Sequence, residues 1–157
     1  MNDARPPLTR ELLLGAWELC AWTCTRDGAA HGAPFGETPR GMLVYSADGH
    51  MAAVLGRGDA PPTGAVTLAA APVEAQARAA ASTVAYAGSW ELDEGRVSHQ
   101  VRVALHPDQV GSRLVRLAEL DALGQLVLET APERTRSGHV VVNRLVWRRP
   151  AAGHLAP

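Results

Sequence analysis

Short segments in which apolar and polar residues alternate run through most of this chain, and they limit its fold more than any other feature. They predict strands at residues 16–26, 41–47, 50–57, 86–92, 96–105, 113–120, 125–130 and 139–147. Alternation turns one set of side chains toward a core and the other toward water, and turn residues separate the segments. The pattern predicts an all-β fold, an eight-stranded antiparallel barrel of a size that encloses packed side chains or one small ligand.

One stretch between the strands favours a helix instead, at residues 72–84. Pro72 stands at its first position, Glu74 follows in the first turn, and alanine is frequent, all of which favour helix. We therefore expect one short helix between the third and fourth strands. Its small apolar residues suit a helix that lies across a mouth of the barrel as a lid or plug. Asp48-Gly49, between the second and third strands, is the strongest hairpin signal in the chain.

Length, charge and cysteine content narrow the class of protein. The 157 residues predict a single domain over 1–157, with the barrel at about 10–149 and loose ends. The net charge is −1 and no basic run occurs, so nucleic acid is not an expected partner. No apolar stretch could span a membrane and the start lacks a signal-like core, so we expect a cytoplasmic protein without a membrane partner. Cys20 and Cys24 lie about 13 Å apart along one predicted strand, at ~3.3 Å per residue, which is too far for a disulfide.

Two tryptophans and two tyrosines are expected inside the barrel. Trp17 is predicted to close one end, with Arg148 or Arg149 from the last strand stacked on its ring. Tyr86 and Trp90 share one face of their strand, where they either pack the core or line a pocket. Tyr45 and Met51 face inward on the neighbouring hairpin and are the other apolar candidates for ligand contact.

His99 is the most informative titratable residue. It alternates with polar neighbours and shares its face with Val97, Val101 and Val103, so it points to the apolar side. A structural ring satisfied by a hydroxyl or carbonyl is the leading interpretation, and ligand recognition and acid–base catalysis are the alternatives. In the last strand Asn143 and His139 share an apolar face and add polar groups to the interior.

Several of these segments together resemble the bacterial and fungal lipocalin-like domain family. The similarity lies in Gly15-Ala16-Trp17, in the Tyr-x-Ala-Asp-Gly pattern of the 41–51 hairpin, and in residues 85–92, 97–99, 106–111 with Arg116, and 145–147. The resemblance implies a small barrel with an interior pocket, related in shape to lipocalins and fatty-acid-binding proteins. Arg116 alternates with Val115 and Leu117, so the pattern leaves its direction open: outward it is a solvated charge, and inward it needs a carboxylate or an anionic ligand. The resemblance favours the inward direction.

Three hypotheses for function follow. The first is a binding module for a small, mostly apolar molecule, with the ligand-binding residues Tyr45, Met51, Tyr86, Trp90, His99, Arg116 and Asn143. The second is a cofactor-free cyclase or isomerase of a natural-product pathway, acting on a polyketide-like or terpenoid substrate, with His99 or Tyr45 as the catalytic residue that moves a proton. The third is a fully packed accessory barrel that binds nothing. No metal or cofactor motif occurs, so none is expected, and a homodimer is left open.

Overall fold

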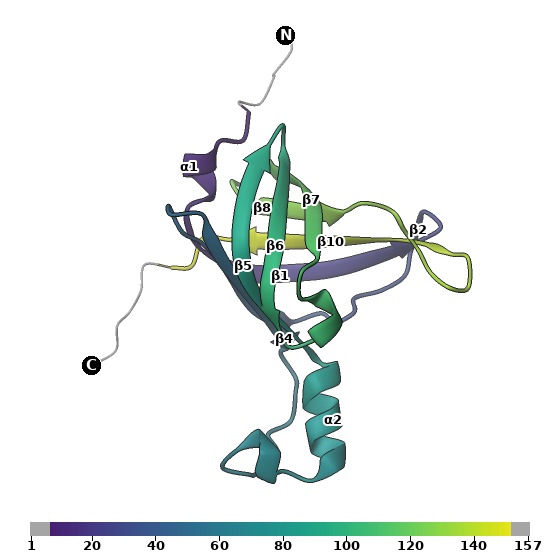
Figure 1. Cartoon of the computed structure of the whole chain (residues 1–157). Helices are drawn as coiled ribbons and strands as arrows, with labels where there is room; N and C mark the ends of the chain where they lie inside the picture. Colours follow the sequence, from purple (N-terminus) through teal and green to yellow (C-terminus); the bar gives the residue numbers. More distant parts are fainter. Residues whose placement is uncertain (1–6, 152–157) are drawn as a thin grey trace.

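Eight long antiparallel strands close into a barrel in the computed structural model, which describes residues 7–151 (Figure 1). In spatial order they are β1 (Gly15–Arg26), β3 (Pro39–Tyr45), β4 (His50–Arg57), β5 (Thr83–Asp93), β6 (Arg96–Ala104), β7 (Arg113–Leu120), β8 (Leu126–Thr130) and β10 (Val140–Arg148). Pairing of β1 with β10 closes the ring. Two short strands, β2 (Ala29–Ala30) and β9 (Glu133–Arg134), extend the edges of β1 and β10. The predicted eight-stranded barrel is confirmed. The predicted loose ends fall partly on residues 1–6 and 152–157, which lie outside the described residues.

The turns form where their residues favour them. Gly49 takes φ +88° in the turn that joins β3 to β4, and Tyr45 pairs with Met51 across it, so the predicted hairpin is confirmed. The first two strands of the barrel in chain order, β1 and β3, are joined by a long loop that contains β2. Two 3₁₀ turns, η1 (Leu68–Ala70) and η2 (Pro107–Gln109), lie in the connections before β5 and between β6 and β7.

Two helices accompany the barrel, α1 (Arg10–Leu13) before β1 and α2 (Val73–Ala81) between β4 and β5. The helix predicted at 72–84 is therefore present but shorter, because β-branched Thr83 and Val84 already pair with β4. Its place in the chain, between the third and fourth long strands, is as predicted, but it does not lie across a mouth of the barrel as a lid or plug. In Figure 1, α2 extends away from the barrel beyond the ends of β4 and β5, and it lines a small pocket together with the 60–63 linker.

Two β-bulges shift which side chains face inward. One lies at Cys20 in β1, between the pairs that Leu19 and Ala21 make with β10. The other lies at Arg102 in β6, where Gly88 of β5 pairs with Val101 and Ala87 with Val103. A Cβ on Gly88 would stand 1.9 Å from the carbonyl oxygen of Gln100, so only glycine permits this close approach.

The second bulge corrects one expectation. Val103 was predicted to share the inner face with His99, but 61% of its surface is exposed. The extra residue in β6 reverses the alternation after Val101. The bulge at Cys20 in β1 also reverses the alternation, but there it turns the side chains of Trp22 and Cys24 toward the interior.

A plug of aromatic side chains fills one end of the barrel. The ring of Trp17 is buried, and its Nε1–H donates to the carbonyl of Leu13 in α1 at 2.8 Å. The Arg149 guanidinium lies 3.7 Å from the centre of this ring and also donates to the carbonyls of Leu12 and Ala16. The predicted plug is confirmed with Arg149 as the stacking partner, whereas Arg148 pairs with Glu18 on the outer face. Cys20 and Cys24 are free, as expected.

Candidate functional site

A cavity of about 230 Å³ opens at the end of the barrel opposite the Trp17 plug. Its wall comes from all eight long strands and from η2. Apolar side chains supply most of the wall, with Trp22, Leu55 and Leu114 among them. The polar residues that line it are Tyr86, His99, Gln109, Arg116, Thr130, Glu133 and Asn143. A wider groove of about 980 Å³ lies on the outside of the plugged end, between the segment around α1 and the 92–95 and 118–124 turns.

A hydrogen-bonded chain of three rings links the plugged end to this cavity. The hydroxyl oxygen of Tyr45 lies 2.8 Å from Nε2 of His99, and that of Tyr86 lies 3.0 Å from Nδ1. Tyr45 and His99 are both buried, with 1% of their surface exposed. The ring is therefore satisfied by hydroxyls, which agrees with the structural interpretation of His99.

Burial sets the protonation of these groups. It lowers the pKa of His99 to about 3, with a further contribution from the positive charge of Arg116. It raises the pKa of Tyr45 well above its ordinary value and that of Tyr86 less strongly. At neutral pH the chain therefore consists of two phenols and a neutral imidazole. Since both ring nitrogens of His99 are engaged by hydroxyls, neither is free to take a proton from a ligand directly.

Arg116 of β7 and Asn143 of β10 face the cavity from the two sides of β8. The guanidinium of Arg116 donates to the carbonyl of Val115 at 3.0 Å, and no ion pair involving it is found within residues 7–151. The Oδ1 atom of Asn143 accepts a hydrogen bond from Nε1 of Trp22 at 2.9 Å, and because an indole N–H can only donate, the contacted atom must be the oxygen.

The structure brings together four of the seven expected site residues, which are Tyr86, His99, Arg116 and Asn143. The other three do not line the cavity. The rings of Tyr45 and Trp90 contact each other in the plug, with centres 4.6 Å apart. Met51 is also buried there and pairs with Tyr45 across the β3–β4 hairpin. Depth along the barrel axis separates the two groups, since all seven point inward.

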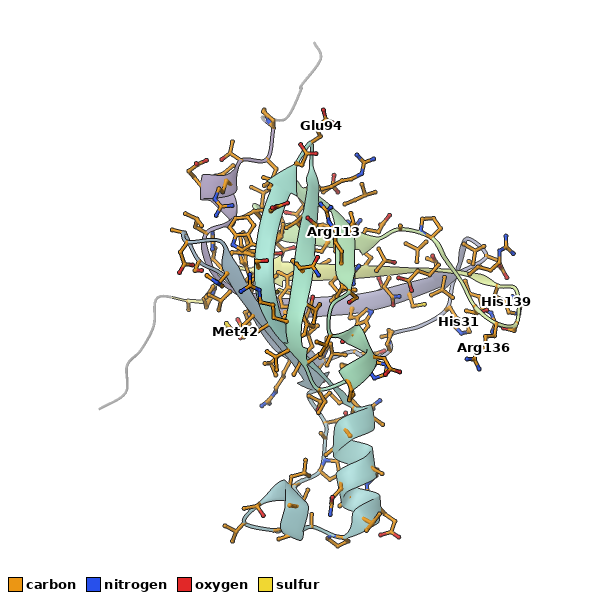
Figure 2. The ribbon with its side chains drawn as sticks, viewed as in Figure 1. His31, Met42, Glu94, Arg113, Arg136 and His139 are labelled. Atoms are coloured by element: carbon orange, nitrogen blue, oxygen red, sulfur yellow. The ribbon has the colours of Figure 1, made fainter. Side chains whose placement is uncertain are left out.

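His139 corrects a further expectation. It was expected on the inner face with Asn143, but its Nδ1 lies 2.7 Å from a carboxylate oxygen of Asp27 in the loop beyond β1 (Figure 2). The strand β10 begins only at Val140, so alternation does not extend to His139.

Sequence reasoning missed several lining residues. Trp22 was missed because the bulge at Cys20 reverses the alternation counted from Trp17. Thr130, Gln109 and Glu133 stand at or beyond the ends of strands, where periodicity gives no direction. Alternation with Arg116 on the same strand could have indicated Leu114.

The described part of the chain holds neither a metal-binding cluster nor a membrane-spanning helix. No cluster of three or more His, Cys, Asp or Glu side chains able to hold a metal occurs between residues 7 and 151. Over the same range, no helix has the length and apolar character needed to cross a bilayer.

The family described as the lipocalin-like domain matches residues 14–150, which covers the whole barrel from β1 to β10. No curated protein matches the chain.

Proposed function

Since the chain belongs to the lipocalin-like domain family, we propose that its barrel holds a small, mostly apolar molecule in the cavity opposite the Trp17 plug. The observation that carries this proposal is the cavity itself. A barrel closed at one end by Trp17 and open at the other leaves about 230 Å³ unfilled, lined mainly by apolar groups. At ~30 Å³ for each water-sized group, this space takes about eight such groups. That size suits a short-chain or single-ring compound and argues against the fully packed barrel.

Octan-1-ol is a suitable first probe because its nine heavy atoms match this space. Binding should change the tryptophan emission in a saturable way, because Trp22 and Trp147 both line the cavity. A probe present at 100 times its Kd stabilises the folded protein by about 2.7 kcal/mol, which raises the Tm by about 5–10 °C.

A matched pair of variants locates the probe. Ala53 is buried in the cavity wall, and Ala53→Leu adds three carbons there. Val54 is the next residue of β4 and is exposed on the outer face, so Val54→Leu is the control. Binding should fall in the first variant and persist in the second. If the wild type shows no saturable response, or both variants bind equally, the cavity is not the binding site.

A cyclase or isomerase is a second candidate, and the hydroxyl of Tyr86 favours it. This phenol stands at the cavity wall at the end of the Tyr45–His99–Tyr86 chain, where it could stabilise a developing enolate. Tyr45 would then act through His99 as a positioning residue, because it does not line the cavity. In D₂O, where solvent deuteroxide takes the α-proton from octan-2-one and D₂O returns a deuteron, exchange followed by NMR should be faster with the wild type than with Tyr86→Phe. Equal rates would remove this candidate.

A further inference from the structure

We propose that the molecule held in the barrel is a small apolar acid, whose carboxylate is bound by Arg116 and by the hydroxyl of Tyr86. This inference rests on the proposed function, because it names the class of ligand for the same cavity. It depends on four observations, which concern the place of Arg116, its missing counter-ion, the direction of the hydrogen-bonded chain, and the balance of donors and acceptors in the wall.

Three polar side chains stand side by side around the wall. Arg116 of β7 pairs with Thr130 of β8, and the backbone N–H of Asn143 of β10 donates to the hydroxyl of Thr130 at 3.0 Å. All three line the cavity. A ligand group in front of this row therefore meets a cation, a hydroxyl and an amide together.

Arg116 lacks a counter-ion among the described residues. Its one hydrogen bond goes to the carbonyl of Val115, and Glu133 is the only acidic residue among those that line the cavity. Glu133 is exposed in the short strand β9 and forms no ion pair with Arg116. A half-buried guanidinium without a carboxylate has lost part of its hydration without gaining a partner, and an anionic ligand restores that loss.

The hydrogen-bonded chain has a direction that presents a proton to the cavity. Among the described residues, the buried hydroxyl of Tyr45 has only Nε2 of His99 as a partner. If the hydroxyl accepted from Nε2–H, its own proton would be left unpaired in the core, so Tyr45 donates. The neutral His99 then carries its proton on Nδ1 and donates it to the oxygen of Tyr86. The Tyr86 hydroxyl proton remains free to point at a ligand.

The other polar groups of the wall also offer donors. Asn143 uses its amide oxygen for Trp22, which leaves its NH₂ group available. Thr130 accepts from the backbone of Asn143 and keeps its own O–H. The Nε1–H of Trp147, another lining residue, is buried and has no partner in the described structure. The cavity thus has several available donors, and apart from Gln109 and Glu133 its hydroxyl and amide oxygens already accept one hydrogen bond each.

A carboxylate matches this arrangement. It accepts hydrogen bonds at two oxygens with about four lone-pair directions, and its flat geometry fits a guanidinium through two parallel bonds. The remaining space is apolar and small, so the rest of the ligand should be a short hydrocarbon chain or one ring.

The test compares octanoate with octan-1-ol, which share a chain of eight carbons and differ in the acid group. Titration calorimetry on the wild type should give at least tenfold tighter binding of octanoate, because a hydrogen bond to a charged group contributes about tenfold or more in affinity. Arg116→Gln should remove this preference while octan-1-ol changes less than threefold. Arg116→Lys keeps the charge but loses the fork, and should give an intermediate preference.

Two more variants test the other groups. Tyr86→Phe should weaken octanoate by about tenfold or more, because a hydrogen bond to the charged carboxylate is gone. Glu133→Gln is the matched control for charge, and it should leave octanoate binding equal or stronger. Circular dichroism and the Tm of each variant establish that it is folded.

The outcomes separate this proposal from the proposed function. If octan-1-ol binds and Ala53→Leu blocks it, but octanoate binds no more tightly or Arg116→Gln keeps the preference, the acid proposal is wrong and the apolar cavity stands. If neither probe binds the wild type, both proposals fail. Octanoate preference that is lost in Arg116→Gln and retained in Glu133→Gln supports the acid.

Discussion

Removal of the Tyr45 hydroxyl tests the directed hydrogen-bonded chain most sharply. In Tyr45→Phe, Nε2 of His99 loses the donor that lies 2.8 Å away, and both residues are buried, so water cannot replace it. An unsatisfied buried polar group costs about 1–3 kcal/mol, which is a factor of about 5–150 in the unfolding equilibrium. For a domain of this size the Tm should fall by roughly 2–4 °C for each kcal/mol.

Tyr86→Phe is the matched comparison, because it removes one hydroxyl from the other side of the same ring. The Nδ1–H group of His99, which loses the Tyr86 oxygen 3.0 Å away, faces the cavity, so water can replace that oxygen. We expect a cost below about 1 kcal/mol. Urea denaturation of both variants measures the difference in the free energy of unfolding.

The proposed direction of the hydrogen-bonded chain requires that Tyr45→Phe lose more stability than Tyr86→Phe. If Tyr86→Phe is as destabilising as Tyr45→Phe, the proposed direction of the chain is wrong. Nitrogen NMR of His99 gives an independent check, since Nδ1 should show the chemical shift of a protonated nitrogen and Nε2 that of a bare one. A protonated Nε2 would refute the direction even if the stabilities agreed.

Three further predictions concern pH, the plug and the bulge. The pKa of His99 is lowered from 6.5 to about 3, so below pH 6.5 the unfolded chain binds a proton that the native state excludes. The free energy of unfolding should therefore be highest above pH 6.5 and should fall as the pH drops, by up to about 1.4 kcal/mol per pH unit. In urea titrations between pH 6.5 and 4.5, His99→Gln should lose this slope. Arg149→Ala removes the cation over Trp17 and two hydrogen bonds, and should cost about 1–3 kcal/mol by thermal unfolding, whereas Arg148→Ala removes only a solvent-exposed ion pair with Glu18 and should cost clearly less. Gly88→Ala places a Cβ against the Gln100 carbonyl and should cost about 1–3 kcal/mol or more of folding stability. In Gly56→Ala the added Cβ has ordinary space, so this variant should lose little stability.

Each of these has a clear contrary result. A native state whose stability is flat between pH 6.5 and 4.5 would mean that His99 is charged or exposed in the fold. Equal losses in Arg149→Ala and Arg148→Ala would show that the stacked cation adds nothing to the plug. Equal stabilities of the Gly88→Ala and Gly56→Ala proteins would place the β6 bulge elsewhere.

The class of fold and the direction of many side chains could be predicted from the order of the residues. Strict alternation predicted eight strands, Asp48-Gly49 predicted the hairpin, and Trp17 predicted a plug with an arginine from the last strand. Tyr86 and His99 were expected to face inward from alternation, and Arg116 from the family resemblance, and all three line the cavity. Apart from the direction of Arg116, these features depend on strand periodicity and turn chemistry, which are set by residues close together in the sequence.

Tertiary structure alone decided how deep each side chain lies and which contacts it makes. Tyr45 and Trp90 point inward like Tyr86, yet the register of the barrel places them in the plug and not at the cavity. The bulges at Cys20 and Arg102 reverse the alternation, so Trp22 lines the cavity and Val103 is exposed. A bulge forms between two strands that are paired in space, and depth depends on the stagger of all eight strands. The periodicity of a single strand predicts neither the position of a bulge nor the depth of a side chain in the barrel. The donor-lined cavity could therefore be identified only in the closed barrel.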